Sequence, residues 1–225
     1  MNYEKYGEVF RHECVTLING DCMELLADLE DDTFELAVVD PPYGIGIHGQ
    51  KETKNKTRKP KQIRKAHTAK EWDQSIPERN YFMKLEGSSK NQIIWGANYF
   101  VEHLIKGKKG WIVWDKGQHG LTMSDCEIAY SSFEKPTRVW VQNRCILNQE
   151  GTIHPTQKPV KLYDWIYANY AKPTDRILDT HLGSGSSAIS AHRAGLEFVG
   201  IELDPDYFAA SVERFKRETA QHSLF

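Results

Sequence analysis

The clearest hydrophobic pattern lies in the C-terminal third of the chain, where two short apolar runs each end in an acidic residue. Apolar residues at helical spacing precede and follow these runs. In chain order, we predict a helix at 158–170, a strand at 176–179, a Gly/Ser turn at 181–186, a helix at 187–194, a strand at 197–202 and a helix from Asp204 to about Arg217. This strand–turn–helix–strand order is typical of a parallel α/β sheet.

The N-terminal part continues the pattern with further apolar runs of strand length. The predicted elements are strands at 14–19, 36–39, 92–95 and 111–114, a short helix at 23–29, and two antiparallel strands at one edge, 126–131 and 138–141. We therefore expect residues 1–225 to form a single α/β domain, with a mostly parallel twisted sheet and an antiparallel edge.

Composition removes several classes of protein. Hydrophobic residues make up 40% of the chain, enough for a core, but no stretch approaches the ~20 apolar residues that span a bilayer. The first residues contain no apolar export segment, and the four cysteines form no CxxC pair. We expect a reduced, cytoplasmic setting without a membrane partner.

Charge is distributed unevenly, although the net charge is only −2. Residues 51–70 carry nine basic side chains and one acid, so this tract is +8 and the rest of the chain is −10. The tract has no apolar periodicity, which indicates a loop inserted at about 46–72. A charged loop is often only solvated, but a basic tract on an acidic body also suggests an anionic partner.

The sequence Asp40-Pro41-Pro42-Tyr43 directly follows the apolar run at 36–39. Open α/β sheets build their sites at the carboxyl ends of their strands, so this turn is a candidate for catalysis. Two prolines also end strands, and an Asp before them is a common turn residue. The motif alone therefore leaves a purely structural interpretation open.

A second polar turn follows the run at 176–179. Asp179 ends that run, Gly183 and Gly185 follow, and Glu202 ends the next strand. Glycines let the backbone approach a ligand closely, and an acid at the next strand end can accept hydrogen bonds from ribose hydroxyls. The pattern therefore fits a nucleoside ligand. A third motif, HPTQKP at 154–159, indicates by itself only a turn that enters a helix.

Together, the DPPY turn, the HPTQKP motif and the D-x-x-x-G-x-G turn, in this order, resemble the beta class of amino-directed, S-adenosylmethionine-dependent DNA methyltransferases. The resemblance covers about residues 17–208. It implies a Rossmann-like methyltransferase fold with a circularly permuted motif order, in which the family's sheet begins with the C-terminal strands here and finishes with the N-terminal ones.

The resemblance also implies which residues bind S-adenosylmethionine. Glu202 is expected to hold the ribose, and Asp21 the adenine amine, although an Asp before a short helix is also a common N-cap. The full expected set is Asp21, Cys22, His154, Thr156, Lys158, Asp179, His181, Gly183, Ser184, Gly185 and Glu202. The sequence departs from the family at Thr180-His181, where the family usually has Pro and Phe, so the aromatic packing beside the cofactor is in question.

The catalytic residues that the resemblance implies are Asp40, Pro41, Pro42 and Tyr43. An exocyclic amine is a poor nucleophile because its lone pair is delocalised into the base. A carboxylate oxygen of Asp40 and the carbonyl of Pro41 can accept the amine hydrogens, and Tyr43 can stack on the base. The prolines hold these acceptors rigidly, and Asp40 can later receive the proton. A base in a duplex must be flipped out to reach this turn, and no metal is required.

DNA is the expected partner. The basic tract starts eight residues after Tyr43, and its side chains are expected to contact phosphates. These side chains are Lys51, Lys54, Lys56, Arg58, Lys59, Lys61, Arg64 and Lys65. Target-recognition elements are expected at about 115–150. Members of the family often dimerise, so a homodimer is one state that the resemblance allows.

We predict methylation of adenine N6 in DNA, because an Asp at the first position of DPPY favours adenine in this family and a Ser favours cytosine N4. A cytosine-N4 DNA methyltransferase and an RNA adenine methyltransferase stay open, because both would use the same turn. The alternative outside the enzymes is an inactive nucleic-acid-binding subunit. Such a subunit is expected to have lost a motif, and Asp40, the glycines and Glu202 are all present.

Overall fold

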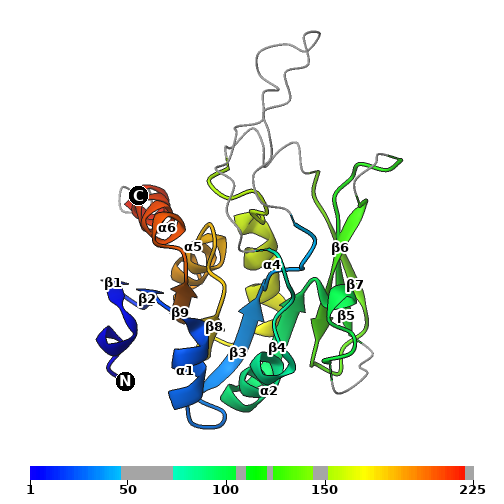
Figure 1. Ribbon diagram of the computed structural model, residues 1–225. Coiled ribbons are helices and arrows are strands. Elements are labelled where there is room, and N and C mark those ends of the chain that lie inside the picture. Colours follow the sequence, from blue (N-terminus) through cyan, green and yellow to red (C-terminus); the bar gives the residue numbers. More distant parts are fainter. Residues whose placement is uncertain (47–72, 105–109, 121–123, 144–151, 221–225) are drawn as a thin grey trace.

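The computed structural model describes residues 1–46, 73–104, 110–120, 124–143 and 152–220 (Figure 1). Within these ranges, no helix combines the length and hydropathy needed to cross a bilayer. The strands are β1 (Glu8–His12), β2 (Val15–Asn19), β3 (Phe34–Val39), β4 (Ser89–Trp95), β5 (Trp111–Asp115), β6 (Cys126–Ser131), β7 (Arg138–Val141), β8 (Arg176–Asp179) and β9 (Glu197–Glu202).

The described strands form one sheet of nine, in the order β1-β2-β9-β8-β3-β4-β6-β5-β7. Strand β1 pairs antiparallel with β2, and β6 pairs antiparallel with both β4 and β5. The other neighbouring pairs are parallel. This arrangement confirms the predicted α/β fold class with its mostly parallel sheet.

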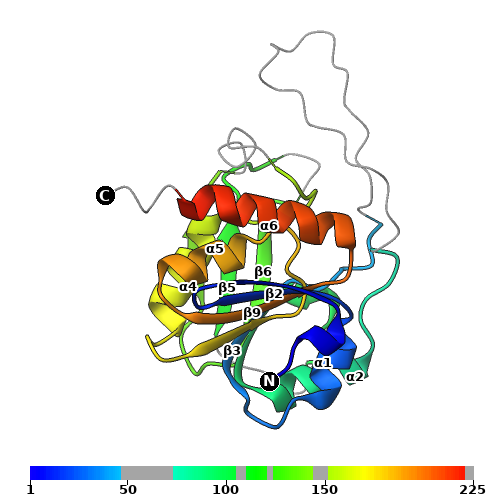
Figure 2. The same ribbon diagram turned by 90° about the vertical axis from the view of Figure 1, so that its left-hand side faces the viewer.

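Helices cover both faces of the sheet. They are α1 (Cys22–Asp28), α2 (Arg79–Ser88), α4 (Val160–Tyr170), α5 (Ser186–Arg193) and α6 (Pro205–Ala220), with two short 3-10 helices, η1 (Glu4–Tyr6) and η3 (Ala97–Tyr99). Figure 2 shows α4, α5 and α6 on one side of the sheet and α1 and α2 on the other. The result is a three-layer α/β/α arrangement.

The hydrophobic core is divided by the sheet into two clusters. Successive residues of a strand point to opposite faces, so Leu36 and Val38 of β3 pack with residues of α4, α5 and α6, whereas Ala37 and Val39 pack with residues of α1 and α2. A strand that is covered on both faces needs apolar side chains at every position. This requirement explains the uninterrupted apolar runs in the sequence.

The predicted antiparallel edge pair at 126–131 and 138–141 is wrong. Strand β6 lies inside the sheet between β4 and β5, and β7 pairs in parallel with β5, with Ile112 opposite Arg138. An antiparallel edge does exist, but it is β1, which the hydrophobic pattern did not predict. Most of β1 is exposed or half-buried, so it has no apolar run to reveal it.

The carboxyl ends of the parallel strands meet at one edge of the sheet. Asn19 ends β2, Asp179 ends β8 and Glu202 ends β9, while Asp40 and Gly96 directly follow β3 and β4. The polar motifs singled out in the sequence therefore converge on the edge where open α/β sheets carry their sites.

Candidate active site

A pocket of about 400 Å³ opens at this edge. It is lined by the turns after β2, β3, β8 and β9 and by the segment that leads into α4. The lining residues are Gly20, Asp21, Cys22, Asp40, Pro42, His154, Thr156, Gln157, Lys158, Tyr163, Thr180, His181, Leu182, Gly183, Ser184, Ser186, Glu202, Leu203, Asp204, Pro205 and Tyr207. The pocket thus brings together the expected cofactor-binding residues, apart from Asp179 and Gly185, with two residues of the DPPY turn.

Backbone hydrogen bonds build the wall between β8 and β9. The N–H of Gly183 donates to Oε2 of Glu202 at 2.8 Å, and the N–H of Asp204 donates to Oε1 at 2.9 Å. Gly183 adopts the left-handed φ of +52°, and a Cβ there would find its nearest neighbours about 4 Å away, on His154 and His181. Glu202 therefore fixes a glycine turn whose backbone is open to a ligand.

Asp179 stands behind this wall and does not line the pocket. Its carboxylate is 2% exposed and accepts hydrogen bonds from the hydroxyl of Ser187 at 2.5 Å and from the N–H of His181 at 3.0 Å. Burial raises the pKa of Asp179 to about 7. The residue fastens the glycine turn to the first turn of α5, so its contribution to the pocket is indirect.

His181 takes the aromatic position that the sequence left in question. Its ring meets the ring of Tyr81 edge to face, with centroids 5.3 Å apart, and its Nδ1 lies 3.0 Å from the hydroxyl of Thr180. That hydroxyl also lies 2.7 Å from the hydroxyl of Tyr81. Burial lowers the pKa of His181 to about 4, so the ring is neutral at pH 7. The imidazole therefore acts here as an uncharged aromatic ring.

Two acidic residues at the pocket edge also cap helices. Asp21 accepts a hydrogen bond from the N–H of Met23 at 2.8 Å, so the expected N-cap of α1 is confirmed, and Asp21 lines the pocket as well. Asp204 accepts from the N–H groups of Asp206 and Tyr207 at the start of α6. Next to Asp21, burial raises the pKa of the Cys22 thiol to about 12, so this thiol is neutral.

The HPTQKP segment forms another part of the pocket lining. Nδ1 of His154 accepts from the N–H of Thr156 at 3.3 Å, and the His154 ring packs edge to face on Tyr207 of α6, with centroids 4.4 Å apart. Through Tyr207, the segment is held against the turn that follows β9. The His154 ring also lies beside the glycine turn, about 4 Å from where a Cβ of Gly183 would stand.

The DPPY turn places its acid and its aromatic ring in direct contact. The hydroxyl of Tyr43 donates to Oδ1 of Asp40 at 2.6 Å, and Nζ of Lys158 forms an ion pair with Oδ2. Burial raises the pKa of Asp40, and the charge of Lys158 opposes that rise. Lys158 was expected beside the cofactor. It lines the pocket, but its charged end pairs with the Asp40 carboxylate.

Two residues that sequence reasoning did not single out complete this cluster. Nζ of Lys158 also lies 3.1 Å from Oε2 of Glu127, and Nζ of Lys116 lies 2.9 Å from Oε1 of the same carboxylate. Glu127 belongs to β6 and Lys116 follows β5. Neither residue belongs to a motif, so only the folded arrangement connects them to Asp40.

The ring of Tyr43 is seated tightly. It stacks on Tyr99 at a centroid distance of 5.0 Å and meets Phe100 edge to face. Gly96, with a left-handed φ of +71°, lies so close that a Cβ there would be 2.1 Å from Cε1 of Tyr43. The first residues after β4 therefore set the position of the tyrosine ring, and sequence reasoning missed them too.

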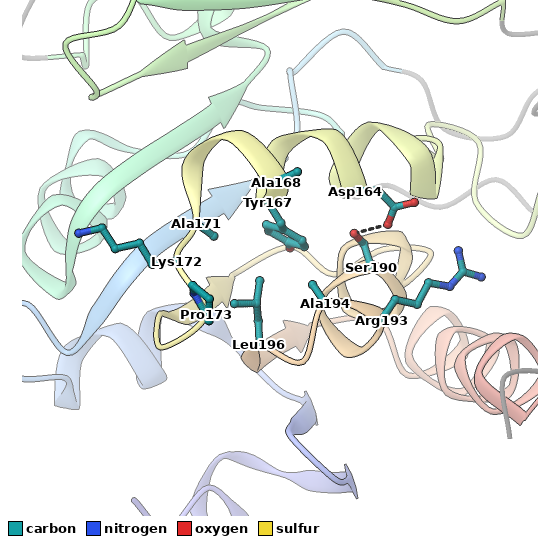
Figure 3. A pocket seen from close by; sticks show the side chains of 10 residues that line it. All are labelled: Asp164, Tyr167, Ala168, Ala171, Lys172, Pro173, Ser190, Arg193, Ala194 and Leu196. Carbon is teal, nitrogen blue, oxygen red and sulfur yellow. Dashed lines mark hydrogen bonds between the residues drawn. The ribbon is translucent and has the colours of Figure 1, made fainter.

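A second hollow lies between α4 and α5 and holds none of the motif residues (Figure 3). Its volume is about 530 Å³, and small or apolar residues such as Ala168 and Leu196 form much of its lining. Asp164 accepts a hydrogen bond from Ser190 there at 2.6 Å, and Figure 3 shows Lys172 and Arg193 at opposite ends. This hollow shares no lining residue with the pocket that holds the motif residues.

The predicted nucleic-acid-binding residues, Lys51, Lys54, Lys56, Arg58, Lys59, Lys61, Arg64 and Lys65, lie outside the described residues. Parts of the expected target-recognition region, 121–123 and 144–151, also lie outside them. The described part of that region supplies Lys116 and Glu127 to the ion-pair cluster around Asp40.

Comparison with known proteins places the chain in a family. The family model for DNA methylases of the N6/N4 type matches residues 90–213. The type II methyltransferase M.HinfI of Haemophilus influenzae is 24% identical over 250 aligned positions, which cover 89% of this chain and 68% of that protein. The chain therefore belongs to the N6/N4 DNA methylase family, whose members are S-adenosylmethionine-dependent methyltransferases.

Solved structures show the same fold. The M1.HpyAVI–SAM complex has a TM-score of 0.57 and 19% sequence identity, and the match covers 89% of this chain and 99% of that one. The cytosine-N4-specific PvuII DNA methyltransferase has a TM-score of 0.58 and 14% identity, over 96% and 95% of the two chains. The predicted family, fold class and cofactor class are thus confirmed, while adenine specificity stays a prediction.

Proposed function

We propose that this chain transfers a methyl group from S-adenosylmethionine to the exocyclic N6 amine of an adenine flipped out of DNA. One observation carries the proposal. The Asp40 carboxylate is held by Tyr43 and Lys158 in the lining of the same pocket that Gly183 and Glu202 line. An acceptor for an amine and a binding site for a nucleoside therefore share one cavity.

The pocket fits the cofactor in its size and in its chemistry. Carboxylates at two strand ends can accept hydrogen bonds from hydroxyl and amine groups, and the open backbone at Gly183 permits close approach. A carboxylate oxygen has two lone pairs, so the backbone bonds to Glu202 leave it able to accept from a ribose. We assign Glu202 to the ribose, Asp21 and Cys22 to the adenine, and His154, Thr156, His181, Gly183 and Ser184 to the amino-acid end.

Asp179, Gly185 and Lys158 take supporting roles in this proposal. Asp179 holds the glycine turn from behind. Gly185 has a left-handed φ of +73°, and a Cβ there would come within 3.3 Å of Ser211 in α6. This glycine therefore lets α5 and α6 pack closely beside the pocket. Lys158 serves the catalytic acid instead of the cofactor.

The protein's own part in the reaction is to make the amine a better nucleophile. When bound, S-adenosylmethionine supplies the electrophilic methyl group. Asp40 and the carbonyl of Pro41 accept the two amine hydrogens, which draws the nitrogen lone pair out of conjugation with the base. The carboxylate then stabilises the positive charge that develops on the nitrogen, and it receives the proton directly or through water.

Tyr43 and the prolines keep the acceptors in place. The tyrosine hydroxyl holds one oxygen of Asp40, and its ring is fixed by Tyr99 and Gly96. Pro41 and Pro42 restrict the backbone through their fixed φ angles. A base that stacks on such an aromatic ring gains roughly 1–3 kcal/mol.

The choice of adenine rests on the Asp in the first position of the DPPY turn. The fold does not distinguish the two bases, because the similar PvuII enzyme is specific for cytosine N4. DNA as the polymer is supported by the family, and the +8 tract that follows the turn would neutralise phosphates. We also propose that the whole chain acts as one methyltransferase domain.

Transfer of a labelled methyl group tests the proposal directly. Purified protein is incubated with labelled S-adenosylmethionine and with duplex DNA, single-stranded DNA or RNA, and the modified nucleoside is identified by mass spectrometry. We expect N6-methyladenine in DNA. Label on cytosine N4 would overturn the base assignment, and label on RNA alone would overturn the polymer. Binding of the cofactor without any transfer would favour an inactive nucleic-acid-binding subunit.

A further inference from the structure

The catalytic acid is the first member of a chain of alternating charges that crosses four elements. Oδ2 of Asp40 pairs with Nζ of Lys158, which reaches Oε2 of Glu127, and Oε1 of Glu127 pairs with Nζ of Lys116. These residues come from the end of β3, the entry to α4, strand β6 and the turn after β5. The cluster therefore links the catalytic turn to the part of the chain expected to recognise the target.

Lys158 has no hydrogen-bonding capacity left for a substrate. Its side chain is 2% exposed, and its three N–H bonds point to Asp40, to Glu127 and to the Tyr43 hydroxyl, which lies at 3.2 Å. The rings of Trp95 and Tyr43 lie 5.3 Å and 5.7 Å from the ammonium nitrogen. Lys158 is therefore placed to act on Asp40 and not on a bound molecule.

A surplus of positive charge beside the acid would work against the reaction. The amine nitrogen gains positive charge, which Asp40 must attract, and an unbalanced ammonium next to that acid would repel the same charge. Glu127 balances the ammonium of Lys158, and Lys116, which is 5% exposed, balances the second acid. The cluster as a whole carries two positive and two negative formal charges.

Resting on the proposed function, we propose that Glu127 and Lys116 are positioning residues, which act through Lys158 to keep Asp40 a rigid, ionised acceptor in a cluster without surplus positive charge. Stability alone is a weak reason for such a cluster. Buried ion pairs often contribute no more than apolar residues of similar size, because the charges lose their hydration. A role in setting the charge at Asp40 explains why two further charges, the buried Lys116 and the half-buried Glu127, are retained.

Of the titratable groups around the cluster, the tyrosines are uncharged, whereas Asp179 gains a negative charge as the pH rises through about 7. Burial raises the pKa values of Tyr43, Tyr81 and Tyr163 well above their usual range, so these tyrosines are neutral. Asp179, at the end of β8, also faces Asp40 across the sheet edge, and burial raises its pKa to about 7. Lys158 and Lys116 hold the pKa of Glu127 at about 2 despite its burial, so Glu127 stays charged.

Two substitutions should move the titration of Asp40 in opposite directions. Glu127→Gln leaves the cluster with one surplus positive charge, so the pKa of Asp40 should fall and the acid limb of the kcat/KM profile should move to lower pH. Lys158→Met removes the cation, so the same limb should move to higher pH. We expect kcat to fall about 10- to 100-fold for Glu127→Gln, less than for loss of a group that contacts the reacting atoms, with cofactor affinity within about threefold.

A double variant tests charge balance more sharply. Adding Lys116→Met to Glu127→Gln restores a neutral cluster, so it should recover at least about fivefold in kcat over Glu127→Gln alone. A merely structural role predicts the opposite, because the double variant loses one more buried contact. Glu35→Gln is the matched control. Glu35 is also a half-buried acid on a strand and contacts two cations, Lys90 and Arg176, and its loss should leave kcat and the pH profile unchanged.

Carbon-13 NMR titration of the Asp40 carboxyl group gives a readout that needs no catalysis. Opposite shifts of its pKa in the two single variants would support the charge cluster even if the wild-type protein transferred no methyl group, in which case the proposed function fails on its own. Unchanged titration of Asp40 and an unchanged kcat in Glu127→Gln, alongside an active wild-type protein, would overturn the inference and leave the proposed function standing.

Discussion

At the β8–β9 end of the pocket, the lining groups are held by hydrogen bonds to the backbone, whereas at the β3–β6 end they are held by ion pairs between side chains. Glu202 accepts hydrogen bonds from two backbone N–H groups, one two positions away and the other 19 positions away, within a single strand–turn–helix–strand unit. Asp40 instead depends on Lys158, which is 118 positions away and itself needs Glu127. A wall built from backbone is specified locally, but a charge cluster is specified only by the complete fold.

The largest expected effect is loss of the acid at the side-chain end. The D40N variant keeps the shape of the residue but removes its charge, so methyl transfer should fall by about 10²- to 10³-fold. Cofactor binding by calorimetry should be nearly unchanged, because the β8–β9 wall is intact. D28N is a suitable control, since Asp28 pairs with Lys5 on the surface. Near-normal transfer by D40N would refute the proposed mechanism.

A methyl group at position 96 should also impair the β3–β6 end of the pocket while leaving the β8–β9 end intact. In Gly96→Ala, the new Cβ would stand 2.1 Å from the Tyr43 ring, on a backbone with a φ of +71°. The ring must move, which should cost about 1–3 kcal/mol of stability and about tenfold or more in kcat. Gly195→Ala is the matched control, with a φ of +66° and open space around it. Equal changes of stability and kcat in the two variants would show that the packing of Gly96 against the Tyr43 ring does not influence the reaction.

Asp179, which supports the β8–β9 wall, should make the free energy of unfolding depend on pH. The pKa of Asp179 is about 7 in the folded protein, against 3.8 for an ordinary aspartate, so the folded state keeps a proton that the unfolded chain releases. The free energy of unfolding should therefore fall as the pH rises from about 4 to about 7, by about 1–4 kcal/mol from this residue. Urea denaturation at pH 5 and pH 7.5 should show a smaller difference for D179N. An equal difference would contradict the assignment.

The smallest effect is expected at His181, where the sequence departs from the family pattern in the same wall. His181→Phe replaces a neutral ring by another that can keep the edge-to-face contact with Tyr81. The hydroxyl of Thr180 retains its partner on Tyr81, so cofactor affinity should stay within about threefold. A loss of tenfold or more would mean that the imidazole nitrogens themselves contact the cofactor.

The difference between the two ends also explains what could be predicted from the sequence. The DPPY turn, the glycine turn and Glu202 are short local patterns at the ends of apolar runs, and they predicted both the sheet edge and the pocket wall. Glu127 and Lys116 carry no such signal, because a single charged residue in or beside a strand usually faces solvent. Strand β7 was mispaired for a related reason. Its exposed valines, Val139 and Val141, gave no sign of which neighbour it joins.

The reversed direction of β6 has a consequence for how new specificities can arise. Because β6 runs against β4 and β5, its first residues, and not its last, lie at the pocket edge, where Glu127 stands opposite Trp114. The connection that enters β6 therefore ends within two residues of Glu127, which contacts Asp40 through Lys158. A change of length or sequence in this connection would shift Glu127 and, through Lys158, Asp40. We therefore expect this connection to tolerate less variation than a loop that leaves the end of a parallel strand.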